Sequence, residues 1–142
     1  MLRHVLVFTA ALIALSALPV ASSAQEPFPG SWHTEAIVNG MNCTFDRVLT
    51  VTGTFRETVH CGSLIMGQSG TYQVFPNHTV LFVVTNWSPT RRYVRDNNGS
   101  GGHYELNLKP PSSTYAYTFA GPNTLTFRHV VYGNAATFRR VR

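Results

Sequence analysis

Acidic residues are scarce in this chain, and charged residues of either sign are few. Asp and Glu contribute 6 of the 142 residues, against 11 Lys and Arg, for a formal net charge of +5. So few carboxylates argue against the paired acids of a glycosidase. The sparse charge also argues against a disordered or halophilic chain. The basic balance indicates a loose preference for anionic partners. No nucleic-acid-binding motif accompanies it, so we expect no nucleic-acid partner.

The sequence also shows no cluster of residues that could bind a metal ion or catalyse a reaction. His33, His60 and His129 are scattered, and each faces at most one neighbour across a predicted hairpin. A metal site needs three or four converging ligands, and no serine has the spacing of a nucleophile elbow. We therefore expect no catalytic residue, no metal, no cofactor and no enzyme activity. The predicted cross-strand neighbours of the three histidines are Asp46, Thr44 and Tyr115.

The only long apolar segment lies at the start of the chain. A short basic stretch, residues 1–4, precedes apolar residues 5–20, and residues 22–24 form a small-x-small site. This pattern predicts a signal peptide, residues 1–24, cleaved after Ala24. An uncleaved anchor is the alternative, which the break at Pro19 disfavours. We expect a secreted or periplasmic chain with no membrane span after cleavage, a short spacer at residues 25–29 and one domain at residues 30–142.

After residue 24, short runs rich in Val, Thr, Tyr and Phe alternate with turn signals, and no run has helical spacing. We predict an all-β, antiparallel up-and-down meander. Eight or nine such strands usually close into a barrel, because closure removes both exposed edges; a two-sheet sandwich is the rival. Gly67 and Gly70 indicate a bulge or an irregular entry into a strand. The predicted strands are residues 31–38, 41–50, 54–61, 71–75, 79–86, 103–108, 114–120, 124–132 and 135–141.

Turn lengths fix the register of the first three strands. A two-residue Asn39-Gly40 turn, favoured in hairpins because both residues tolerate positive φ, pairs Ala36 with Cys43. A three-residue loop that ends in Gly53 then pairs Cys43 with Cys61. An even pair of cysteines in an exported chain favours a disulfide over a metal site or a reactive thiol.

The same register separates the side chains into an apolar inner face and a polar outer face, which supports it independently. Further along, Tyr72 and Val74 are predicted to lie across from Val83 and Leu81. The inner face of the first three strands would carry Trp32, Thr34, Ala36, Val38, Met41, Cys43, Phe45, Leu49, Phe55, Val59 and Cys61.

Arg47 and Glu57 are the exception, because they are charged and point inward. A buried charged pair is expensive unless it is paired and hydrogen-bonded. One interpretation is a polar anchor for a ligand in the cavity. The other, favoured by the short distance to the Gly53 turn, is a solvated pair at the mouth of the barrel.

Residues Gly30-Ser31-Trp32, at the start of the first strand, resemble the G-x-W signature of lipocalins and related calycin barrels. The resemblance implies that the Trp closes one end of the barrel under an Arg of the last strand. Arg139 or Arg140 could fill that role, and Arg47 competes for the same ring. The chain has no T-D-Y motif and no helix after the last strand, so the resemblance implies at most a cavity for a small apolar molecule.

The outline also resembles bacterial periplasmic inhibitors of metalloproteases, in which residues 25–29 would be a reactive trunk rather than a spacer. Avidin-like barrels begin similarly, but most residues of a biotin pocket are missing here. The basic loop 88–102 reads either as a lid or anion-binding patch, or as a solvated crossover.

We therefore expect a non-enzymatic binder of a small apolar or amphipathic ligand. An envelope protein-interaction module and a filled structural barrel are the alternatives, since eight strands leave room for either side chains or one small ligand. The predicted ligand-binding residues are Trp32, Phe45, Arg47, Trp87, Tyr115, Tyr117, Phe119 and Phe127.

Overall fold

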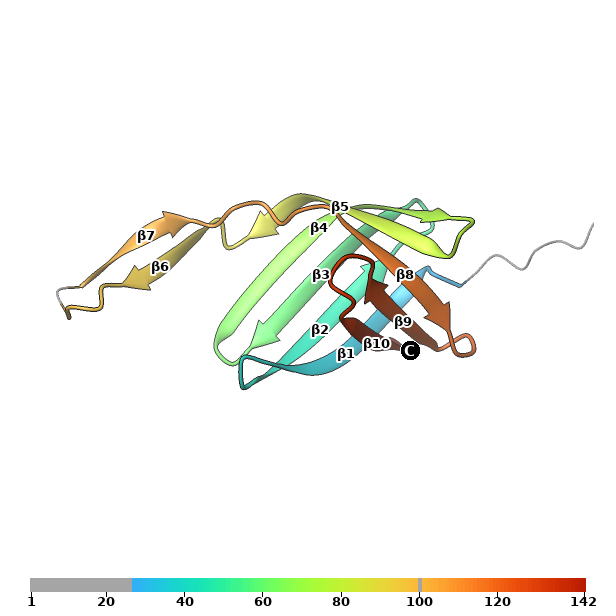
Figure 1. Ribbon diagram of the computed structural model, residues 1–142, viewed down its shortest axis with the longest axis horizontal. Helices are drawn as coiled ribbons and strands as arrows, with labels where there is room; N and C mark the ends of the chain where they lie inside the picture. Colours follow the sequence, from blue (N-terminus) through green and yellow to red (C-terminus); the bar gives the residue numbers. More distant parts are fainter. Residues whose placement is uncertain (1–26, 100) are drawn as a thin grey trace, which may run out of the picture.

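The computed structural model describes residues 27–99 and 101–142, and it is all-β and antiparallel (Figure 1). Eight strands close into one barrel, in the order β1-β10-β9-β8-β5-β4-β3-β2, and β6 and β7 form a separate two-stranded ribbon. The signal peptide predicted for residues 1–24 lies outside the described residues. The strands are β1 (Gly30–Val38), β2 (Met41–Leu49), β3 (Thr54–Cys61), β4 (Leu64–Phe75), β5 (Thr79–Ser88), β6 (Arg91–Arg95), β7 (Gly102–Leu106), β8 (Ser113–Phe119), β9 (Thr124–His129) and β10 (Ala135–Val141).

The first three strands have the predicted register at every pair. Asn39 and Gly40 both adopt positive φ, and Gly53 does so at the end of its loop. Ala36 therefore pairs with Cys43, and Cys43 with Cys61. The two cysteines form the predicted disulfide. Local turn chemistry was sufficient here because each loop has a length that allows only one pairing.

The β4–β5 hairpin corrects the prediction by one residue. Its turn has three residues rather than two, with His78 at φ 57°, so that Phe75 pairs with Thr79. Tyr72 therefore lies across from Phe82, not from Val83. Because side chains alternate between the two faces of a strand, the one-residue difference turns the opposite set of β5 side chains toward the interior. The inward residues are Val80, Phe82 and Val84, and all three are buried.

The predicted bulge is present between Ser69 and Gly70, and its extra residue is Thr85 on β5. Gly70 is required there, because a Cβ on it would overlap the main-chain carbonyl of Val83. The bulge shifts the alternation of β5, so that Trp87 pairs with Gln68 and shares its inward face.

The segment expected to supply a sixth barrel strand instead folds back on itself outside the barrel. β7 pairs with β6, and β5 pairs directly with β8. Pro110 and Pro111 follow β7, and proline cannot donate to a sheet ladder. Figure 1 shows the resulting ribbon projecting from the barrel on the side of the β1–β2 and β3–β4 turns. Among the described residues, no helix is long and apolar enough to cross a membrane.

One end of the barrel, where β1 begins and β10 ends, is closed by Trp32. Its indole is 1% exposed and donates from Nε1 to the carbonyl of Phe28 at 2.9 Å. The guanidinium of Arg140 lies 4.3 Å from the centre of the Trp32 ring. The predicted arginine over this ring is therefore Arg140 rather than Arg139 or Arg47.

Arg140 also ties three separate segments together. Its nitrogens donate to the carbonyls of Pro29 at 2.7 Å, Pro27 at 2.5 Å and Pro122 at 3.1 Å. Gly30 makes room for it, since a Cβ at that position would overlap the guanidinium. The ring of Phe28, a residue of the expected spacer, enters the barrel and packs edge-on against Tyr117 at 4.6 Å.

We expect Cys43→Ser/Cys61→Ser to lower the free energy of unfolding by about 2–3 kcal/mol, because the disulfide restricts the unfolded chain. Urea unfolding followed by tryptophan fluorescence measures the change. Reducing the wild-type protein should reproduce the loss, and the same treatment should leave the double variant unchanged. A double variant as stable as the wild-type protein would refute a stabilising role for the disulfide.

Arg140→Ala should lower the free energy of unfolding by about 2–3 kcal/mol, because it leaves three carbonyls and the face of Trp32 without their partner. Arg139→Ala is the matched control, since this neighbouring side chain is exposed, and its cost should stay below about 0.5 kcal/mol. Urea unfolding of both variants gives the comparison. Equal losses would contradict the assigned role of Arg140.

Candidate functional site

The closed half of the barrel interior is filled with aromatic rings. Trp32, Tyr117 and Phe127, three of the predicted ligand-binding residues, belong to its buried core. Tyr115 and Phe119 pack against that core and are partly buried. Edge-to-face contacts connect these rings, for example Phe28 with Phe119 at 5.1 Å. Such packing leaves no room for a ligand at this end.

The other half of the interior is hollow. A cavity of about 370 Å³ lies there, within the range of small-molecule sites. Phe45 and Trp87, two more of the predicted residues, form part of its wall. Three of the other apolar wall residues were predicted on the inner face but not as ligand-binding residues, and they are Val38, Val59 and Cys61. The remaining three, Met66, Leu108 and Pro110, were not predicted in the interior.

A second cavity of about 210 Å³ adjoins the first, since Gln68 and Pro110 line both. Its wall includes Arg47 and Tyr115, the remaining predicted residues that lie at a cavity. The two cavities therefore surround one polar group of side chains in the middle of the barrel.

That polar group consists of Arg47, Glu57 and Gln68. Arg47 donates from Nε to Oε2 of Glu57 at 2.7 Å, and its Nη2 lies 2.5 Å from the same oxygen. Gln68 donates from Nε2 to the other carboxylate oxygen at 2.8 Å. The Glu57 side chain is 4% exposed and that of Arg47 is 11% exposed. Both carboxylate oxygens thus have donors, as a buried charge requires.

The expectation of a solvated pair at the mouth of the barrel is wrong. The Arg47 guanidinium lies 4.8 Å from the ring centres of both Phe82 and Phe138. Nearness to the Gly53 turn misled the prediction, because Phe28 and Trp32 close that end of the barrel. A residue close to a turn is therefore deep inside.

One donor of this group has no partner. Nη1 of Arg47 is buried, and no described atom accepts its hydrogen bonds. An unsatisfied buried donor costs about 1–3 kcal/mol, and an oxygen placed against it recovers that cost. Arg47 also lines the smaller cavity, which adjoins the larger apolar one, so the interior combines an apolar hollow with a neighbouring hollow lined by a guanidinium.

Gln68 could have been found from the sequence. The two-residue Gly62-Ser63 turn pairs Cys61 with Leu64, and counting along β4 then places Gln68 opposite Glu57. By contrast, Leu108 and Pro110 have no local signal. They reach the cavity because Trp87 donates from Nε1 to the carbonyl of Asn107 at 2.8 Å.

The open end of the barrel carries exposed apolar residues on the strand ends that flank the β1–β2 and β3–β4 turns, in the β9–β10 loop, and at the end of β7 and just after it. Val38, Met41 and Leu64 occupy inward positions of the ladders, yet each is exposed, which shows that nothing in the described chain covers this end. We call this set the open rim. It consists of Ile37, Val38, Met41, Leu64, Ile65, Leu106, Leu108, Val130, Val131 and Tyr132.

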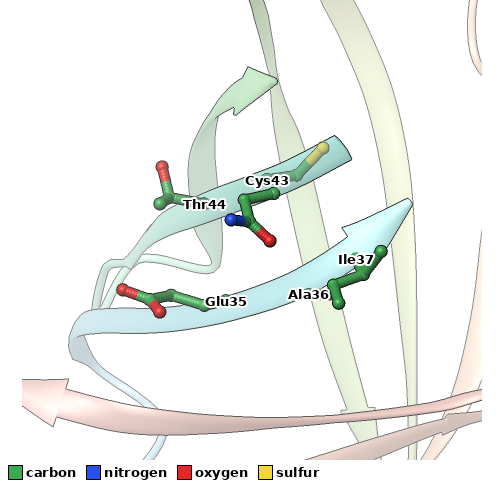
Figure 2. Close-up of a pocket in the computed structure, with 6 residues that line it drawn as sticks. Glu35, Ala36, Ile37, Cys43 and Thr44 are labelled. Carbon is green, nitrogen blue, oxygen red and sulfur yellow. The ribbon is translucent and has the colours of Figure 1, made fainter. Parts of the chain in front are cut away.

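A further hollow of about 510 Å³ runs along β1 and β2. Figure 2 shows its labelled residues on two adjacent strands. They are consecutive ladder pairs such as Glu35 with Thr44 and Ala36 with Cys43, which alternate between the two faces of the sheet. Glu35 is the only ionisable group in the wall of this hollow, so the residues there indicate neither a catalytic site nor a particular ligand.

The predicted basic loop is largely the β6–β7 ribbon, and part of its charge is compensated. Arg92 donates to Glu105 at 3.2 Å, and His103 lies 3.0 Å from the same carboxylate. Hydrogen bonds from His103 and Arg92 hold the pKa of Glu105 below its ordinary value. Arg91 and Arg95 lie on the opposite face of the ribbon, with Tyr93 between them.

The histidines lie where the register predicted. His33 and Asp46 are 2.7 Å apart on the outer face, and the hydrogen bond to Asp46 raises the pKa of His33. Across the described residues, no group of three or more His, Cys, Asp or Glu side chains could hold a metal ion.

We expect Glu57→Leu to destabilise the fold by about 3–5 kcal/mol, because it leaves the Arg47 charge buried without a partner. Arg47→Met/Glu57→Leu should recover most of that loss, since an apolar pair needs no counter-charge. Chemical unfolding of Arg47→Met, Glu57→Leu and the double variant measures the three free energies of unfolding that a double-mutant cycle needs. Losses that simply add in the double variant would mean that the two charges are not coupled.

Comparison with known proteins assigns no family to this chain. No protein-family model matches it, and no curated protein is similar to it at a significant level.

Proposed function

We propose that this chain is an exported, non-enzymatic, lipocalin-like domain that binds one small amphipathic ligand in the open half of its barrel. The cavity of about 370 Å³ is the observation that carries the proposal. A core filled throughout would have no hollow of this size, because protein interiors are close-packed. The stacking of Arg140 on Trp32 supports the lipocalin-like comparison.

The lining of the cavities suggests the chemical class of the ligand. Phe45, Met66 and Trp87 offer an apolar surface for a hydrocarbon or ring portion. Arg47 lines the adjoining smaller cavity, and its Nη1 is a buried donor without a partner among the described residues, which favours an oxygen acceptor there. Glu57 already neutralises the Arg47 charge, so a carbonyl or hydroxyl oxygen suits the site better than a second carboxylate.

The inhibitor alternative has less support. Its reactive trunk would be residues 25–29, but Phe28 of that segment is buried in the core. The carbonyls of Pro27 and Pro29 on either side accept hydrogen bonds from Arg140. A segment held in this way would have to leave the barrel before it could enter another protein. The filled-barrel alternative describes the closed half of the interior but not the open half.

Native mass spectrometry of the protein recovered from its own envelope tests the proposal. We expect a reproducible adduct of small-molecule mass that denaturing extraction releases. Recovered protein that carries no adduct and also fails to bind an added neutral probe, N-phenyl-1-naphthylamine, would overturn the proposal and favour the filled barrel.

Met66→Trp should lower the affinity for N-phenyl-1-naphthylamine by at least about tenfold, because the larger side chain enters the cavity. Ile65→Trp is the matched control, since Ile65 precedes Met66 on β4 and points to the outer face. Probe fluorescence measures both affinities. If both substitutions weaken binding equally, the probe is not bound in this cavity.

A further inference from the structure

The open rim concentrates exposed apolar side chains at one end of the molecule. Ile37, near the end of β1, is 74% exposed, and Val131, in the β9–β10 loop, is 75% exposed, although the two are far apart in the sequence. The antiparallel topology brings these loops to the same end of the barrel. Soluble proteins seldom gather so many exposed apolar side chains at one end unless that end contacts something.

The charges around the open rim are of one sign. The segments at this end of the barrel are residues 36–43, 60–67, 86–91, 106–114 and 128–136, and together they contain no Asp or Glu but include Arg91, Lys109 and Arg128. The acids next to these segments in the sequence are Glu35, which lies 3.6 Å from His33, and Glu105, which lies 3.2 Å from Arg92. An apolar ring with a positive border is complementary to an anionic surface that has an apolar interior.

The β6–β7 ribbon repeats this pattern beside the rim. One of its faces carries the cross-strand pairs Tyr93–Tyr104 and Arg91–Leu106. The Tyr93 and Tyr104 rings meet edge-on at 5.2 Å, and both tyrosines are exposed. Exposed tyrosines next to arginine and leucine are typical of side chains that lie at a membrane interface. The ion pairs of the ribbon lie on its other face, at Arg92 and Glu105.

We propose that the open rim docks the protein onto the surface of an anionic phospholipid bilayer, with the barrel mouth facing the lipid. The rim tips are separate loops around a hollow mouth. A rigid partner surface would leave that hollow unfilled, whereas a fluid interface adapts to each tip. Val131 and Tyr132 would enter the headgroup region, and Lys109 and Arg91 would meet the phosphates. This docking does not depend on whether the cavity holds a ligand.

Flotation with lipid vesicles tests the docking. The protein is used as recovered from its exporting host, with its mass checked so that the apolar residues 5–20 are known to be absent. We expect it to float with vesicles of phosphatidylcholine and phosphatidylglycerol, and much less with phosphatidylcholine alone. Ile37→Ser/Val131→Ser should lower the partition coefficient by at least about tenfold, since each side chain loses apolar burial in the interface.

Matched controls come from the closed end of the barrel. Val51 is an apolar loop residue there, 85% exposed, and Val51→Ser should leave flotation unchanged. Lys109→Gln should weaken binding to the anionic vesicles, whereas Arg142→Gln at the end of the chain should not. Met66→Trp, which fills the cavity, should still float, so that loss of ligand binding and loss of docking are distinguishable.

Three results would overturn the docking. The first is no flotation with either kind of vesicle. The second is flotation that Val51→Ser weakens as much as Ile37→Ser/Val131→Ser. The third is a dimer in lipid-free solution, seen by analytical ultracentrifugation, that Ile37→Ser/Val131→Ser dissociates, because a second copy of the chain would then occupy the rim.

Discussion

Closure of the sheet between its first and last strands is the constraint on which the rest of this structure depends. β1 and β10 pair at only three positions, from Ser31 with Val141 to His33 with Arg139. This short ladder is reinforced by Arg140, whose guanidinium covers Trp32 and reaches a carbonyl 111 residues earlier in the chain. Without closure, the inward aromatic residues would have no opposite wall to pack against.

The interior divides at the Arg47–Glu57 pair. On one side, Phe28 and the aromatic residues of β8 and β9 fill the space, and on the other side the side chains leave it empty. An ion pair costs desolvation energy wherever it is buried. Here Gln68 completes the carboxylate and two phenylalanine rings receive the guanidinium face. The boundary between packed core and hollow is therefore polar, and one of its donors, Nη1 of Arg47, has no partner among the described residues.

The hollow half and the exposed rim belong to the same end of the barrel. β8 pairs with β5 only as far as Phe82 with Ser113, so the wall beyond that point is completed by residues 107–112 rather than by a strand. Prolines in that segment cannot extend the hydrogen-bond ladder. Side-chain hydrogen bonds from Trp87 and Asn107 hold the segment in place instead. The opening thus arises from the same chain excursion that produces the projecting ribbon.

Local signals were enough to predict the all-β class, the register of β1 to β3 and the disulfide, because short turns such as Asn39-Gly40 constrain pairing locally. It failed by one residue at β4–β5, where His78 adopts a left-handed conformation that nothing in its side chain required. By contrast, packing across the whole barrel places Arg140 over Trp32, Phe28 in the closed end, and Arg47 and Glu57 deep inside. These outcomes depend on how side chains from eight strands share one interior volume, and no local pattern encodes that volume.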